Sequence, residues 1–183
     1  GAIEKLMLDS NRIAGNTHAG TSNMYLMYAG GSAALSKVEA VRNTITGNSK
    51  SGSGGAMYCI YAGADSVRVF RNQLIDNSIC DTSTISQSLY GYYNIANPRC
   101  ETVDSNRIDG MRGKGNLYGI FSQTISRAYK YFRGDTIVGF SLGGGYGINQ
   151  SSDTVCIITD CLIGDSDSLY GMTAITINNS RYC

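Results

Sequence analysis

The chain has 183 residues, of which 42% are hydrophobic and 16% are charged, with 23 Gly, one Pro, 13 Tyr and no Trp. The length suits a single domain, and the apolar fraction is too high for an intrinsically disordered chain. A net charge of +1 gives no basic field for nucleic acid or anionic lipid. Apolar runs cover only a few residues, so we expect no nucleic-acid partner and no insertion into a membrane.

Short stretches of alternating apolar residues recur along the chain, first at 6–8, then at 67–69 and again at 155–157. The i, i+3, i+4, i+7 spacing of an amphipathic helix is not sustained over three turns anywhere. Breaks rich in Gly or Ser lie between the strands, at 49–55, 110–115 and 143–145. The sequence therefore predicts short β-strands joined by loops of variable length.

A tetrapeptide with Tyr at its second position recurs six times. An apolar residue or Gly precedes the tyrosine, a variable residue follows it, and an apolar residue ends the motif. The tyrosines are Tyr25, Tyr58, Tyr90, Tyr118, Tyr146 and Tyr170. Their separations of 24 to 33 residues are typical of a solenoid, in which each repeat is one turn.

A second motif alternates with the first: an apolar residue, two others, Asn or Asp, one more, then Ile or Leu. Its polar positions are Asn11, Asn43, Asn72, Asn106, Asp135 and Asp160. An Asn at a corner tolerates left-handed backbone, and its amide both donates and accepts, so a stacked column satisfies its own hydrogen bonds. Stacking of the two aspartates would raise the pKa of one of them. We interpret them as variants of the ladder rather than as a catalytic dyad.

Together the repeats predict an all-β fold, a right-handed parallel β-helix of about six to seven coils stacked about 4.8 Å apart. We expect Leu, Ile, Val and the repeat tyrosines to point inward. Glu101 and Lys130 fall where an inward apolar residue is expected, so we predict β-bulges there. We expect residues 1–183 to form one domain, as a segment of a longer protein or a subunit that associates end to end, because uncapped coils expose strand edges.

The motif LYGI at 117–120, together with VDSNRI at 103–108, resembles the right-handed parallel β-helix, or pectin-lyase-like, superfamily. This resemblance covers nearly the whole chain and implies a fold rather than an activity. A narrower likeness lies in ITGN at 45–48 followed by GGAMYC at 54–59. This pair resembles the paired short motifs of polymorphic autotransporter passenger repeats, which are bacterial surface adhesins.

The superfamily includes enzymes that cleave polyuronides, so a polysaccharide lyase or glycoside hydrolase is the alternative function. Of the galacturonase-like pattern, only Arg112 and Lys114 match, in a Gly-rich loop. The sole histidine, His18, has no acidic neighbour, and we expect it to be an exposed loop residue. Asp165 and Asp167 lack the further ligands of a Ca²⁺ loop, which favours an ordinary turn. We therefore expect no catalytic residues, no cofactor and no metal site. An enzyme would instead gather at least three charged groups in one solvent-facing cluster across neighbouring coils.

The six cysteines include no C-x-x-C pair, which argues against structural zinc. No two cysteines occupy equivalent places in adjacent coils, and Cys156 and Cys161 lie five apart on an extended segment. We expect buried or half-buried thiols, and the sequence leaves the redox compartment open. The cysteines are Cys59, Cys80, Cys100, Cys156, Cys161 and Cys183.

If the repeat tyrosines point inward, the residue three positions later points outward. Those residues are Tyr28, Tyr61, Tyr93 and Phe121, followed by Asn149 and Thr173. An exposed aromatic column can stack sugar rings, but the residue pattern taken alone favours mutual stabilisation of neighbouring strands. The sequence thus favours a non-catalytic extracellular or cell-surface module, a rigid spacer or adhesive rod of a microbial surface or secreted protein, with polysaccharide as its expected partner.

Overall fold

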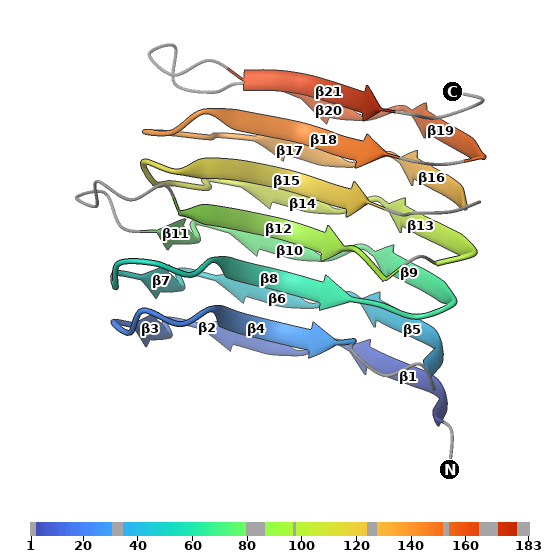
Figure 1. Cartoon of the computed structure of the whole chain (residues 1–183), viewed down its shortest axis with the longest axis horizontal. Coiled ribbons are helices and arrows are strands. Elements are labelled where there is room, and N and C mark those ends of the chain that lie inside the picture. Colours follow the sequence, from blue (N-terminus) through green and yellow to red (C-terminus); the bar gives the residue numbers. More distant parts are fainter. Residues whose placement is uncertain are drawn as a thin grey trace.

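The computed structural model describes residues 3–30, 35–79, 87–96, 98–123, 128–151, 154–164 and 172–178. Within these ranges the chain forms strands, turns and bends, with no helix, and every strand ladder is parallel. Successive turns stack in layers from the N-terminal to the C-terminal end (Figure 1). The protein is a β-solenoid of about five turns, which confirms the predicted parallel β-helix.

Four sheets run along the solenoid, and successive turns contribute neighbouring strands to each sheet. Sheet A contains β1 (Ile3–Asp9), β5 (Leu35–Val41), β9 (Ser66–Phe70), β13 (Cys100–Asp104), β16 (Tyr129–Arg133) and β19 (Val155–Thr159). Sheet B contains β2 (Arg12–Ala14), β6 (Thr44–Thr46), β10 (Gln73–Ile75), β14 (Arg107–Asp109), β17 (Thr136–Val138) and β20 (Leu162–Ile163). Sheet C contains β3 (Thr17–His18), β7 (Ser49–Lys50) and β11 (Ser78–Ile79). Sheet D contains β4 (Met24–Ala29), β8 (Met57–Ala62), β12 (Ser88–Asn94), β15 (Asn116–Gln123), β18 (Gly145–Ser151) and β21 (Met172–Asn178).

The hydrophobic core runs along the inside of the solenoid, where each inward side chain rests on its equivalent in the next turn. Because the strands pair in parallel without slippage, apolar residues form continuous columns rather than one central cluster. The sheet B column contains Ile45, Leu74, Ile108 and Ile137, all fully buried. The sheet D column contains Ile60, Tyr92, Ile120 and Ile148, also fully buried.

Two sharp corners in each turn depend on a residue in the left-handed backbone region. At the corner from sheet A to sheet B, this residue is Ser10, Arg42, Arg71, Ser105, Gly134 or Asp160. At the corner from sheet B to sheet C, it is Gly15, Gly47, Asp76, Gly110 or Gly139. In each case the residue that follows takes the ladder position of its corner. These residues are Asn or Asp from Asn11 to Asp135 at the first corner and from Asn16 to Asn77 at the second, so the corners place two polar columns along part of the solenoid.

The repeat tyrosines face outward, so the prediction that they point inward is wrong. In β8, Tyr58 is half-buried, Cys59 and Ile60 are both buried, and Tyr61 is half-buried. The same pattern recurs in β12, β15 and β18. Two consecutive inward residues interrupt the alternation of the strand, so residues three positions apart share the outer face. A strictly alternating strand would have placed Tyr58 and Tyr61 on opposite faces.

The last turn is also offset from the predicted repeat. Tyr146 pairs with Thr173 and Asn149 with Thr176, so Thr173 takes the place expected for Tyr170. Tyr170 itself lies outside the described residues. In sheet A, Phe132 pairs with Ile158 rather than Ile157. In the last turn the tyrosine motif is therefore three residues, and the Asn/Asp motif one residue, out of register with the sequence-based alignment.

Candidate binding surfaces

Sheet D presents nine aromatic rings on its outer face, arranged in two columns. Column one consists of Tyr25, Tyr58, Tyr90, Tyr118 and Tyr146. Column two consists of Tyr28, Tyr61, Tyr93 and Phe121, which are the four residues selected from the sequence. Tyr25 and Tyr28 are 44% and 50% exposed, and the seven rings in later turns are half-buried by their neighbours. The predicted outward stripe is confirmed as a position in the fold.

The rings of column one are stacked nearly parallel. Successive centroids lie 4.8, 5.0, 4.8 and 5.0 Å apart, and successive planes differ by only 5° to 9°. The spacing is that of the parallel strands beneath, so the backbone register dictates the ring register. Offset stacks of this kind stabilise by roughly 0.5–1.5 kcal/mol per pair beyond the area that they bury. Column one is therefore a ladder that supports sheet D.

Column two is less regular. The ring centroids of Tyr28 and Tyr61 are 4.7 Å apart, and their planes are tilted by 31°. The ring centroids of Tyr61 and Tyr93 are 5.3 Å apart, and their planes are tilted by 36°. Tyr93 and Phe121 stack at 5.2 Å with 8° between their planes. The two columns also meet edge to face, for example where Tyr90 and Tyr93 lie 4.7 Å apart. The nine rings thus form one continuous aromatic surface.

This packing changes the acidity of the phenols. Burial and the neighbouring tyrosines raise the pKa of Tyr93 to about 12, and the same causes raise the pKa of Tyr58 further. Burial also raises the pKa of Tyr90 and Tyr118. These central phenols therefore stay uncharged through neutral and mildly alkaline pH, which suits contact with an uncharged ligand face.

A second surface lies on the outer face of sheet A. A groove of about 350 Å³ is lined by Thr102, Asp104, Tyr131, Arg133, Ile157 and Thr159. Arg133 donates to Asp104 at 2.7 Å. Burial raises the pKa of Asp104, but hydrogen bonds from Ser105 and Arg133 outweigh it, so its pKa lies below the ordinary value. Asp104 therefore remains a carboxylate, which can accept hydrogen bonds or a proton but does not act as a general acid near neutral pH.

Beside the groove, three charged groups come together on the outer side of sheet A. Arg68 from β9, Asp104 from β13 and Arg133 from β16 come from three neighbouring turns, and the charge of Arg68 also acts on Asp104. Arg68 lies over the ring of Phe70, with 4.4 Å between guanidinium carbon and ring centroid. Asp104 and Arg133 are register partners that each follow the first apolar residue of the Asn/Asp motif, so the repeat alignment could have placed these two together. Sequence reasoning missed the cluster because this position of the motif is variable.

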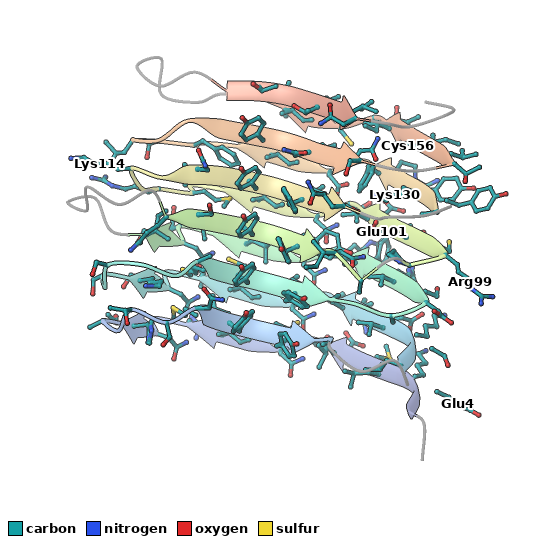
Figure 2. The ribbon with its side chains drawn as sticks, in the orientation of Figure 1. Glu4, Arg99, Glu101, Lys114, Lys130 and Cys156 are labelled. Carbon is teal, nitrogen blue, oxygen red and sulfur yellow. The ribbon has the colours of Figure 1, made fainter. Side chains whose placement is uncertain are left out.

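Inside the solenoid, a polar cluster interrupts the core between sheets D and A. Glu101 and Lys130 are direct register partners and are fully buried, and Figure 2 shows them in adjacent turns with Cys156 in the next. The sheet A register runs through both positions without interruption, so the predicted bulges are wrong. The charges stay inside because the cluster provides hydrogen-bond partners for them.

The hydrogen bonds of this cluster are specific. Glu101 accepts from the Tyr92 hydroxyl, from Asn94 Nδ2 at 3.1 Å and from the Ser122 hydroxyl. Lys130 Nζ donates to the backbone carbonyl of Ser122 at 3.1 Å. Burial and the charge of Glu101 raise the pKa of Tyr92, so this phenol stays protonated and remains a donor.

The predicted Asn column is confirmed from Asn11 to Asp135. Each Asn donates its amide to the side-chain oxygen of the next turn at 2.9 Å, and Asp135 Oδ1 accepts from Asn106. Asp160 is not in the column; it occupies the left-handed corner position, and Cys161 takes the ladder place. Asp135 therefore has no stacked carboxylate, and burial raises its pKa to about 6.

A second Asn ladder was not predicted. Asn16 donates to Asn48, and Asn48 donates to Asn77, each at 2.9 Å. In the following turns Met111 and Phe140 take the same position and are buried. The signal in the sequence was an Asn that follows a Gly or Asp at the second corner. It occurs in only three turns, at Asn16, Asn48 and Asn77.

The other candidate residues occupy separate places. His18 lies in β3, pairs with Lys50 and is half-buried with a buried Nε2, so the prediction of an exposed loop residue is wrong. Arg112 and Lys114 are exposed on the loop side of the solenoid, where Figure 2 labels Lys114 at the edge. Asp165 and Asp167 lie outside the described residues.

The cysteines follow the prediction only in part. Cys59 is a fully buried thiol, and burial raises its pKa to about 12. Cys156 is buried and Cys161 is half-buried, whereas Cys100 is exposed at the start of β13. Cys80 and Cys183 lie outside the described residues.

These features define a class, a parallel β-solenoid with an aromatic outer sheet. The chain shows no significant match to a family model, a curated protein or a solved structure. Over the residues that the structure describes, there is no helix with the length and apolarity needed to cross a membrane. Nor does the described part gather three His, Cys, Asp or Glu side chains in a group that could hold a metal ion.

Proposed function

We propose that this solenoid is a non-catalytic extracellular or cell-surface module, a rigid spacer or adhesive rod of a microbial surface or secreted protein that binds polysaccharide along sheet D. The observation that carries the proposal is the continuous outer surface of nine aromatic rings. Membership of the pectin-lyase-like superfamily and kinship with autotransporter adhesins belong to the same proposal and rest on the sequence resemblance.

The chemistry of the aromatic surface suits a sugar polymer. Sugar rings present apolar C–H faces that pack on aromatic rings, while phenol hydroxyls can exchange hydrogen bonds with sugar hydroxyls. Rings of column one cover each other, so we assign the ligand contacts to column two, whose tilted rings begin with the half-exposed Tyr28. Each contact is weak, and several contacts along one chain are needed for useful affinity.

The test is retention on a glycan array by the unmodified protein and by the double variant Tyr61→Ala/Tyr93→Ala. We expect retention to be lost in the variant while the β-sheet circular dichroism spectrum persists. The matched control is Tyr129→Ala/Tyr131→Ala, which removes two exposed tyrosines from sheet A and should leave retention unchanged. If the unmodified protein retains no glycan, or if the control loses retention instead, the assignment to sheet D is wrong.

A second candidate, a polysaccharide lyase or glycoside hydrolase, is favoured by the cluster of Arg68, Asp104 and Arg133 beside the sheet A groove. In this proposal Asp104, kept ionised by Arg133, would act as the base. The test is release of unsaturated products or reducing ends from uronide polymers. Turnover that Asp104→Asn abolishes supports this function, and absence of turnover across a panel of such polymers refutes it.

A further inference from the structure

Column one places five phenol groups from successive turns in a nearly parallel, offset stack. Each centroid lies 4.8 or 5.0 Å from the next, and the planes are within 9° of parallel. Because successive strands are related by a simple shift along the solenoid, successive rings have nearly the same orientation. Equivalent ring carbons beside successive hydroxyls are therefore separated by about the same distance as the ring centroids.

We propose that column one is a site of oxidative coupling, at which dityrosine bonds form between phenols of neighbouring turns. A one-electron oxidant, such as a peroxidase with hydrogen peroxide, removes one electron from each of two phenols, and each hydroxyl loses its proton to water. The two phenoxyl radicals form a carbon–carbon bond between ring carbons next to the oxygens. The hydrogens on those two carbons then move as protons to the oxygens, so each coupling removes two electrons and two protons overall.

The geometry favours coupling within one molecule. Two phenoxyl radicals on separate proteins must first meet in the right orientation, whereas the stack holds them in contact and converts the step into an intramolecular one. Column two suits this chemistry less well, because Tyr28, Tyr61 and Tyr93 are tilted by 31° and 36° and Phe121 has no hydroxyl. The inference does not depend on polysaccharide binding.

Sheet A provides an internal comparison. Tyr129 and Tyr131 lie on the outer face of β16 and are 50% and 37% exposed. In the described part of the chain, neither ring stacks on another aromatic ring. These two phenols are accessible to an oxidant but lack a stacked phenol, so they separate the effect of stacking from the effect of exposure.

The experiment treats dilute, intact protein with a peroxidase and hydrogen peroxide. We expect dityrosine fluorescence, an intact mass reduced by two hydrogens for each coupling, and a protein that remains monomeric on a denaturing gel. Protease digestion should yield linked peptides that join Tyr58 to Tyr90 or Tyr90 to Tyr118. Arginines separate these tyrosines in the sequence, so trypsin places Tyr58, Tyr90 and Tyr118 on three different peptides. The first of these peptides also carries Tyr61 and the second also carries Tyr92 and Tyr93, so fragmentation of the linked peptides has to assign the bond to Tyr58, Tyr90 or Tyr118.

The decisive variant is Tyr58→Phe/Tyr118→Phe, which keeps every ring but leaves no two adjacent phenols in column one. It should lose both linked peptides and most of the intramolecular dityrosine. The control Tyr129→Phe/Tyr131→Phe removes the same number of phenols from sheet A and should keep both. Undiminished intramolecular coupling in the first variant, or links that map mainly to Tyr129 and Tyr131, would overturn the proposal. Coupling found only between molecules would overturn it equally.

Discussion

Replacing Asp135 by Asn should stabilise the protein at neutral pH and leave it unchanged at acidic pH. In three preceding turns the ladder amide donates to a backbone carbonyl of the turn before, as Asn106 does to Val69 at 3.1 Å. The equivalent carbonyl for Asp135 is that of Val103. Asp135 Oδ2 therefore faces an acceptor, and this fully buried oxygen has no hydrogen-bond partner.

The size of the effect follows from the pKa of Asp135, which burial raises from 3.8 to about 6. At about 1.4 kcal/mol per unit of pKa, this corresponds to about 3 kcal/mol of unfolding free energy. The folded state binds the proton more tightly than the unfolded state. The contribution of Asp135 to stability is therefore greatest below about pH 4, falls as the pH rises towards 6, and changes little above it. An Asn amide carries no charge and can donate to Val103, so the variant should lack this loss.

Urea unfolding of both proteins at pH 4 and at pH 7.5 measures the difference. We expect Asp135→Asn to be more stable by about 3 kcal/mol at pH 7.5 and by less than about 1 kcal/mol at pH 4. Asp76→Asn is the matched control, because Asp76 is exposed and Asn also tolerates its left-handed backbone. An equal gain at both pH values, or no gain at pH 7.5, would refute the reasoning.

Three further predictions concern the interior, the aromatic surface and the end of the solenoid. Lys130→Met should cost about 3–5 kcal/mol in urea unfolding, because it leaves Glu101 buried without its neighbouring cation, and adding Glu101→Gln should restore much of the loss. In a spectrophotometric titration, Tyr93→Phe should remove a phenol that ionises near pH 12, with the earlier part of the curve unchanged. Ile175 and Ile177 are about 40% exposed at positions that are inward in β18. End-to-end association should therefore appear as concentration-dependent sedimentation that Ile175→Lys weakens, and a concentration-independent monomer contradicts it.

The turn-by-turn architecture could be predicted from the sequence because ladders tie residue identity to position. An Asn that recurs after a corner, as at Asn43 and Asn72, stacks on its equivalent to satisfy the hydrogen bonds of its amide. The spacing of these Asn residues in the sequence therefore gives the length of each turn. The orientation of the tyrosines could not be predicted from a two-residue alternation. The orientation depends on two consecutive inward residues, such as Cys59 and Ile60. The alternation of apolar and polar residues in the sequence does not predict where such a pair occurs.

The buried charges and the sheet A groove were not predicted from the sequence either, because their partners come from different strands. Glu101 and Lys130 are inward because their partners come from sheet D strands that are 7 to 21 residues away in the chain. Such compensation is visible only once the turns are stacked. The last turn was misaligned for a related reason, since Asp160 satisfies the corner and Cys161 replaces the expected polar ladder residue.

Strict register between turns also sets the unit by which this protein can change in length. Asn43 and Asn72 occupy the same place in successive turns, 29 residues apart, and Thr44 pairs with Gln73. Removing residues 44–72 would join Asn43 to Gln73 and bring Tyr25 next to Tyr90, with both corners and both aromatic columns preserved. Loss of a few residues inside a strand, by contrast, would shift every ladder at once. Insertions and deletions should therefore be tolerated as whole turns, which allows the reach of the rod to vary while its surface chemistry stays the same.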